Sequence, residues 1–183
     1  MNIYLLDADV INYQVLVFKN NEDARFSLEM NGQSVKNDWK PFELEYSTET
    51  EAEKKLPKGD FPSLLSGDLL VFSPKAVDCL KDLLNPYGEF LPVNCDNDDY
   101  ILFNVTNVID ALDFEKSDVQ CFTHSNDIKN ILKYVFIKEK VINEDIFRIK
   151  QMPQVDIFVN DKFVEIVEKN GLKGFEFKKV WEG

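Results

Sequence analysis

The sequence has few of the residues from which metal sites, disulfide frameworks and nucleic-acid interfaces are built. Its three cysteines, Cys79, Cys95 and Cys121, are an odd number without CxxC spacing, so a disulfide framework and a structural zinc site both lack their minimum. Arg25 and Arg148 are the only arginines and the lysines are scattered singly, whereas a phosphate backbone is bound by a stripe of basic residues. We therefore expect no metal ion, no cofactor and no nucleic-acid partner.

Long apolar runs are missing as well. No stretch approaches the ~18 apolar residues that a membrane span needs. The first 18 residues carry Asp7 and Asp9 in place of the basic start and small-residue cleavage site of a signal peptide. The sequence therefore predicts a cytoplasmic protein without a membrane partner.

The chain does contain ample core material and a strong negative charge. Apolar residues make up 44% of its 183 residues, and a chain of this length buries roughly 70% of its unfolded surface when it folds as one domain. The 33 acidic and 21 basic residues give a net charge of −12. This charge favours a basic protein partner, and it leaves the oligomeric state open.

The order of elements predicts an α+β fold, with a mixed, mostly antiparallel sheet and two or three short helices on one face. Residues 69–93 read as strand, helix and strand, with Ser73 as the N-cap and Pro74 at the first helical position. Residues 156–180 repeat this plan after a cap at Asn160, either as a duplication or as recurrence of a common motif. We expect Leu80 and Val167 to be buried where these helices meet the sheet.

The first 55 residues form a β-rich part, which we expect to pack as one unit with residues 56–183. Residues 25–35 contain Asn31-Gly32 between two short apolar stretches, a pattern typical of a β-hairpin. We expect further strands at residues 3–6, 13–18, 100–105, 118–122, 131–137 and 146–149, a polar connection at 46–59 and a helical turn at 107–112.

A strand that ends in Asp7-Ala8-Asp9 is the clearest catalytic pattern. It resembles the first motif of haloacid-dehalogenase-like phosphatases and the start of PIN-type nucleases, in which carboxylates at a strand end hold Mg²⁺ with further acids from elsewhere. In both families a helix follows, whereas a β-like run follows here. A metal-dependent phosphatase or nuclease-like enzyme using Asp7 and Asp9 is therefore the alternative to a binding protein.

Acidic residues gather between residues 94 and 118, where seven carboxylates stand against one lysine. This density either steers a basic partner or serves solubility alone. Arg148 stands between Phe147 and Ile149, so alternation places it on the other face of its strand, to bind a carboxylate of a partner or form a structural ion pair. The expected partner-binding residues are Asp96, Asp98, Asp99, Asp110, Asp113, Glu115 and Arg148.

Five short stretches follow one another in an order and spacing that point to a known family. They are Leu-Pro-Lys-Gly-Asp-Phe-Pro at 56–62, Val-Phe-Ser-Pro-Lys-Ala at 71–76, Tyr-Ile-Leu-Phe-Asn-Val at 100–105 running into 108–113, Ile-Phe-Arg-Ile at 146–149, and residues 157–175. Over residues 56–180 the chain thereby resembles immunity family eleven of bacterial polymorphic toxin systems. The resemblance implies a non-enzymatic protein that binds and neutralises a cognate toxin domain. The family supplies no catalytic residues, and Asp113 and Arg148 match its recurrent polar positions.

Overall fold

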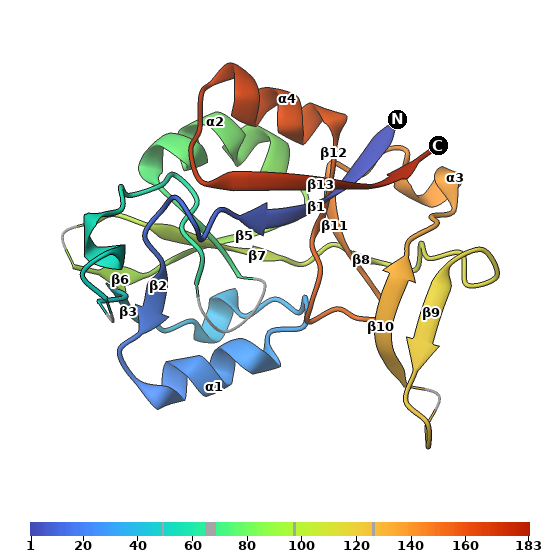
Figure 1. Cartoon of the computed structure of the whole chain (residues 1–183), viewed down its shortest axis with the longest axis horizontal. Helices are drawn as coiled ribbons and strands as arrows, with labels where there is room; N and C mark the ends of the chain where they lie inside the picture. The colour runs from blue at the N-terminus through green and yellow to red at the C-terminus, as the bar shows by residue number, and fades with distance from the viewer. Residues whose placement is uncertain (49, 65–68, 97, 126) are drawn as a thin grey trace.

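The first strand of the chain lies inside a sheet that is otherwise built from the second half. β1 (Asn2–Ala8) pairs antiparallel with β12 (Phe158–Asn160) on one side and with β13 (Phe175–Glu182) on the other. β11 (Ile146–Ile149) pairs antiparallel with β12 and parallel with β8 (Val108–Ile109), which completes the order β13-β1-β12-β11-β8 (Figure 1). The structure is a computed structural model and describes residues 1–48, 50–64, 69–96, 98–125 and 127–183.

A three-stranded sheet carries the first predicted strand-helix-strand unit. β4 (Leu70–Phe72) and β5 (Gly88–Pro92) both pair antiparallel with β7 (Ile101–Val105), which lies between them. α2 (Pro74–Leu84) connects β4 to β5, and it begins where predicted because the Ser73 hydroxyl accepts a hydrogen bond from the Ala76 backbone N–H at 3.1 Å.

The second unit has the same arrangement. β12 and β13 flank β1 as β4 and β5 flank β7, and α4 (Asp161–Lys169) connects them. The Asn160 side chain caps α4 by accepting from the Phe163 N–H at 3.2 Å. α2 and α4 lie side by side over the sheets (Figure 1). Leu80 and Val167 are 0% and 3% exposed in a core cluster that both helices share with the strands beneath them, which confirms the predicted core positions.

The predicted hairpin at residues 25–35 is wrong. Residues 25–29 belong to α1 (Asn21–Glu29), because Asn20 caps a helix there by accepting from the Asp23 N–H at 2.8 Å, and Glu22 and Asp23 complement the positive helix start. Gly32 does adopt a positive φ of 84°, but it turns the chain after a helix rather than between strands. In the described part of the chain, α1 is therefore an additional helix that the sequence analysis did not predict.

α1 is attached to a small sheet at one end of the molecule. β2 (Leu16–Phe18) pairs antiparallel with β3 (Glu43–Tyr46), and β3 pairs parallel with β6 (Asn94–Cys95). Only residues 16–18 of the predicted strand at 13–18 form β2. Short 3₁₀ turns occur at Lys36–Asp38 and, within the predicted polar connection, at Glu53–Lys55.

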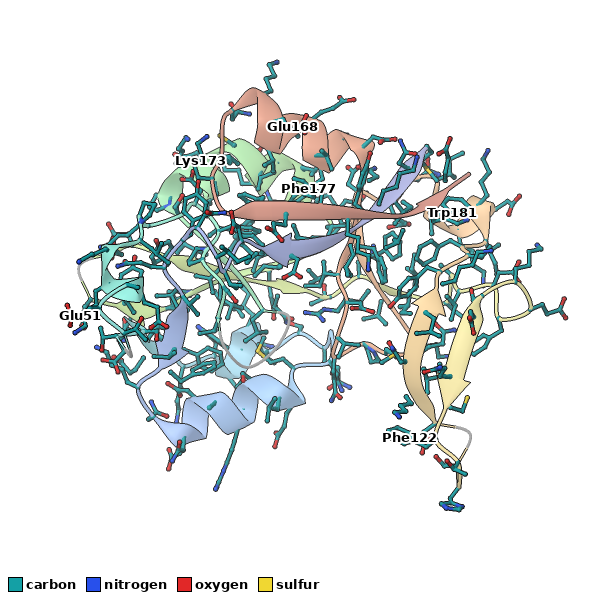
Figure 2. All side chains as sticks on the ribbon, in the orientation of Figure 1. Glu51, Phe122, Glu168, Lys173, Phe177 and Trp181 are labelled. Carbon is teal, nitrogen blue, oxygen red and sulfur yellow. The ribbon has the colours of Figure 1, made fainter. Side chains whose placement is uncertain are left out.

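A hairpin projects from the other end of the molecule. β9 (Asp118–Cys121) pairs antiparallel with β10 (Ile128–Lys133), and Phe122 lies towards its tip (Figure 2). The short helix α3 (Lys138–Val141) follows. The predicted helical turn at 107–112 is wrong, because Arg148 N–H and Lys150 N–H donate to the carbonyls of Asn107 and Ile109 and hold this segment as β8.

Candidate functional site

The predicted partner-binding residues occupy three separate places. Asp96, Asp98 and Asp99 follow β6, and Asp110, Asp113 and Glu115 lie between β8 and β9. β6 and β9 stand at opposite ends of the long axis (Figure 1). Arg148, in β11, is 1% exposed. The acidic segment is therefore divided into two groups, each of which has its own surroundings.

The first acidic group lines an open hollow of about 340 Å³ beside β6. Asp96 points outwards and pairs with the Lys19 ammonium at 2.8 Å. Asp98 is only 22% exposed, and its Oδ2 is 2.6 Å from Lys58 Nζ and accepts from the Tyr46 hydroxyl at 3.0 Å. Asp98 therefore holds the local structure, while Asp96 and Asp99 present their charge to solvent. The hollow, called here the β6 hollow, is lined by Lys19, Glu43, Val93, Asn94, Cys95, Asp96, Asp98 and Asp99.

Burial and negative charge beside the β6 hollow keep the Tyr46 hydroxyl and the Cys95 thiol protonated. The Tyr46 hydroxyl donates to the Tyr100 hydroxyl at 3.0 Å, and burial, this donated hydrogen bond and the Asp98 charge raise the pKa of Tyr46. Burial, helped by Asp98 and Asp96, raises the pKa of the Cys95 thiol to about 11. The hollow is therefore anionic through its carboxylates, with Cys95 as a neutral thiol at physiological pH.

The second acidic group is engaged in local contacts. Asp113 lies 2.7 Å from the Lys116 ammonium, and the hydrogen bond from Lys116 lowers the pKa of Asp113. Asp110 accepts from the Gln151 side chain at 2.6 Å and lies 4.0 Å from Lys140. The Asp110 side chain is 59% exposed, whereas that of Asp113 is only 19% exposed, so Asp110 is the carboxylate of this group that is open to an incoming cation.

Arg148 has a structural place in this fold. Its Nη1 donates at 3.2 Å to the carbonyls of Pro153 and Val155, just before β12. Its neighbours Phe147 and Ile149 are fully buried as well. The guanidinium therefore ties the chain before β12 to β11, inside the molecule.

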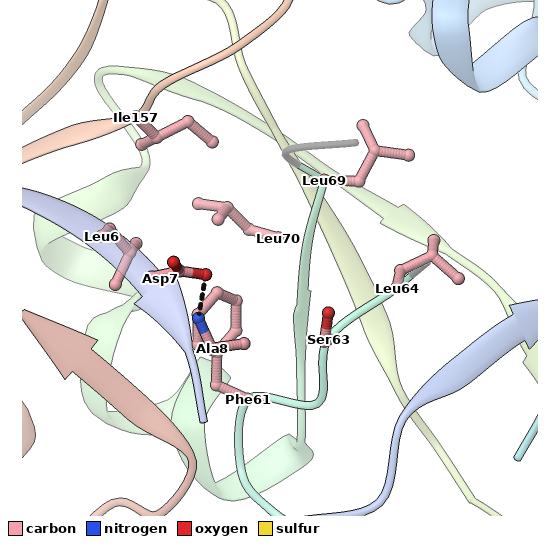
Figure 3. A pocket seen from close by; sticks show the side chains of 9 residues that line it. All are labelled: Leu6, Asp7, Ala8, Phe61, Ser63, Leu64, Leu69, Leu70 and Ile157. Carbon is pink, nitrogen blue, oxygen red and sulfur yellow. Dashed lines mark hydrogen bonds between the residues drawn. The ribbon is translucent and has the colours of Figure 1, made fainter. Parts of the chain in front are cut away.

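Asp7 and Asp9 do not meet at a shared site. The Asp9 carboxylate accepts from the N–H groups of Ile11 and Asn12 at 3.2 and 2.9 Å and from the Asn12 side chain, which together lower the pKa of Asp9. Asp7 borders a small hollow of about 70 Å³, and its Oδ1 accepts from the Ala8 N–H there (Figure 3). A turn follows, and in the described part of the chain no group of three His, Cys, Asp or Glu side chains is placed to hold a metal ion. This geometry gives the enzymatic alternative no support.

A second hollow next to α1 escaped the sequence analysis. It measures about 270 Å³ and is called here the α1 hollow; its lining residues are Glu22, Asp23, Phe26, Asp38, Lys40 and Phe42. The hairpin prediction placed Phe26 in a strand, so the helical face that carries it was not recognised. The spacing of Asn20 and Asp23 at a helix start was the signal that could have revealed it.

Comparisons with known proteins identify the second half of the chain. Residues 93–182 match the model of an immunity protein family, Imm11. This confirms the resemblance over β6 to β13, while the stretches at 56–62 and 71–76 precede the matched residues. No curated protein matches the chain. Among the described residues, no helix is long and apolar enough to cross a membrane.

Proposed function

We propose that this protein, whose residues 93–182 match the Imm11 immunity protein family, is an immunity protein that binds a cognate toxin domain and neutralises it in the cytoplasm. The family match carries this proposal. The net charge of −12 supports a basic toxin domain as the partner. In this account neutralisation comes from binding alone and needs no cofactor.

We place the toxin on the acidic end of the molecule beside β6. Asp96 and Asp99 are exposed on the rim of an open hollow, so a basic surface can approach them without prior rearrangement. The acids between β8 and β9 form the second candidate surface, at the opposite end (Figure 1). A carboxylate that is desolvated against an arginine or lysine contributes roughly 1.5–7 kcal/mol of coupling, so either surface could dominate the affinity.

The test is co-expression with the toxin domain encoded by the neighbouring gene. Cells that produce the toxin domain should grow only when this protein is produced as well, and the two proteins should purify together as a complex. A matched control is an unrelated acidic protein of similar charge, which should give no protection. Growth arrest that persists in the presence of this protein, together with failure to co-purify, would contradict the proposal.

A further inference from the structure

The α1 hollow combines an aromatic floor with an acidic rim. The ring centroids of Phe26 and Phe42 are 6.1 Å apart, and Trp39 packs on Phe42 at 4.6 Å. Phe42 is 1% exposed, whereas Phe26 is 40% exposed and shows its ring to solvent. Glu22 and Asp38 are exposed beside these rings. One hollow thus offers π faces and carboxylates together.

The contacts around this hollow fix its shape before any partner arrives. Trp39 Nε1 donates to the Pro92 carbonyl at 2.8 Å, which ties the floor to the end of β5. Asp23 Oδ2 accepts from Asn20 Nδ2 at 2.8 Å and from the Glu43 N–H at 2.9 Å, which ties α1 to β3. Asp23 is therefore used in holding the helix, which leaves the carboxylates of Glu22 and Asp38 and the ammonium of Lys40 as the rim charges. A preformed site pays little ordering cost on binding.

The α1 hollow adjoins the β6 hollow. Their linings are in contact, because the N–H of Glu43, which lines the β6 hollow, donates to the carboxylate of Asp23, which lines the α1 hollow, at 2.9 Å. The described residues that line the two hollows include seven carboxylates and two lysines. The combined surface therefore has a clear negative excess, which selects a cationic occupant and repels an acidic one.

The size and the aromatic floor narrow the choice of cation. At about 270 Å³ the hollow is large enough to receive one long side chain from a partner surface. A guanidinium is planar, stacks on aromatic faces and forms paired hydrogen bonds with carboxylates, whereas an ammonium does less of each. Arginine matches both the floor and the rim.

We propose that the α1 hollow receives an arginine side chain of the toxin domain, stacked on Phe26 and held by Glu22 and Asp38. This inference rests on the proposed function, because the occupant belongs to the toxin. It adds a contact outside residues 93–182, the part of the chain that matches the family. The N-terminal part would thereby contribute directly to recognition of the partner.

The experiment measures the dissociation constant of the toxin domain from the neighbouring gene with five forms of the full chain, the wild type and four variants. Phe26→Ala removes the exposed ring, and Glu22→Gln with Asp38→Asn removes the rim charge. Each should weaken binding about tenfold or more, while Phe26→Tyr should bind like wild type. The matched control is Leu28→Ala, which truncates an apolar side chain on α1 that is 61% exposed and outside the hollow; it should change binding by less than about twofold.

The outcomes separate this inference from the proposed function. If wild type binds and both hollow variants bind equally well, the inference is wrong and the proposed function stands. If only Phe26→Ala weakens binding, the occupant is apolar rather than cationic, and the inference is again wrong. If wild type does not bind the toxin domain, both fall. The Glu22 and Asp38 variant changes only exposed side chains, so it carries the test even if Phe26→Ala lowers the melting temperature.

Discussion

Single residues beside β6 divide into those that hold the fold and those that are free to meet a partner. Counting acids along the sequence finds Asp96, Asp98 and Asp99 but cannot tell them apart. The distinction arises from Lys58 and Tyr46, which contact Asp98 from 40 and 52 positions away in the chain. Such contacts exist only once β3 and β6 have paired, so no local pattern encodes them.

Arg148 illustrates a second limit of sequence reasoning at this scale. Alternation along β11 places Arg148 on the face opposite Phe147 and Ile149. That face is exposed only if one side of the strand meets water. All four residues of β11 are buried, however, so both faces of this strand are covered where it lies between β12 and β8. The local sequence therefore cannot distinguish a buried arginine that donates to carbonyls from an arginine at the surface.

The exposed acids of the β6 hollow should control the speed of association. Replacing Asp96 and Asp99 by Asn, with Asp98 kept, should slow toxin association at low ionic strength by about threefold to tenfold, a part of the roughly 10- to 1,000-fold that full electrostatic steering gives. The difference should shrink as salt is added. Stopped-flow mixing measures the rates, and the variant carrying Asp110→Asn and Asp113→Asn tests the opposite end. Equal slowing by both variants would contradict the placement of the toxin at β6.

Cys95 gives a chemical readout of the same hollow. In a background with Cys79→Ser and Cys121→Ser, its alkylation by iodoacetamide should reach half its maximal rate near pH 11, compared with about 8.5 for an ordinary thiol. Asp96→Asn should move this midpoint to lower pH, because it removes a negative charge that disfavours the thiolate. A midpoint below pH 9 in the parent would show that the thiol is neither buried nor surrounded by carboxylates as described.

At the scale of elements, local capping chemistry predicted α2 and α4, whereas a turn signal misled at α1. Ser73-Pro74 and Asn160 begin their helices as expected. Asn31-Gly32 is a strong hairpin signal, yet the segment after it is held by β5 rather than by residues 25–30. The Glu89 carboxylate accepts from the Val35 N–H and the Ser34 hydroxyl, both at 2.7 Å. This contact spans 54 residues and overrides the turn preference.

Glu89 should therefore give a measurable pH dependence. Burial acts to raise its pKa, but the hydrogen bonds from Val35, Ser34 and Asn104 outweigh burial and lower the pKa. A lowered folded-state pKa means stability that is present above the unfolded value of about 4.3 and is lost as the pH falls through the folded value. Glu89→Gln should cost about 1–2 kcal/mol at pH 7. Urea unfolding should show this difference shrinking below pH 4; a difference constant with pH would contradict the role of the charge.

The contact between α2 and α4 should dominate the stability of the two strand-helix-strand units. Leu80 is fully buried between them, so Leu80→Ala should lower the free energy of unfolding by about 2–5 kcal/mol through the lost burial and the cavity left behind. Denaturant titration measures the change. Asp78→Ala, on the exposed side of α2, is the control and should change stability by less than about 0.5 kcal/mol. Unfolding of Leu80→Ala that matches wild type would show that this helix is not packed as described.

At the scale of the whole molecule, the family match covers a segment whose sheet is completed from outside it. Residues 93–182 contain β12 and β13, but β1, which joins them, comes from residues 2–8. The order of helical and strand-like segments was enough to predict the α+β class, and the short stretches pointed to the immunity family. They could not predict this insertion of β1, because the pairing of residues more than 150 positions apart leaves no periodic trace in either segment. β1 thus shares a sheet with the matched part, and its Leu6 and Ala8 belong to a core cluster that contains residues of that part.

The most direct test of the account titrates the purified toxin domain with this protein and measures the toxin's activity. A protein that neutralises by binding should reduce the activity linearly until the two are equimolar, and the α1 and β6 variants should weaken this inhibition. Unchanged toxin activity at equimolar protein would contradict the account. So would complete and lasting inactivation by a small substoichiometric amount, because one molecule that inactivates many toxin molecules acts as a catalyst rather than as a binding partner.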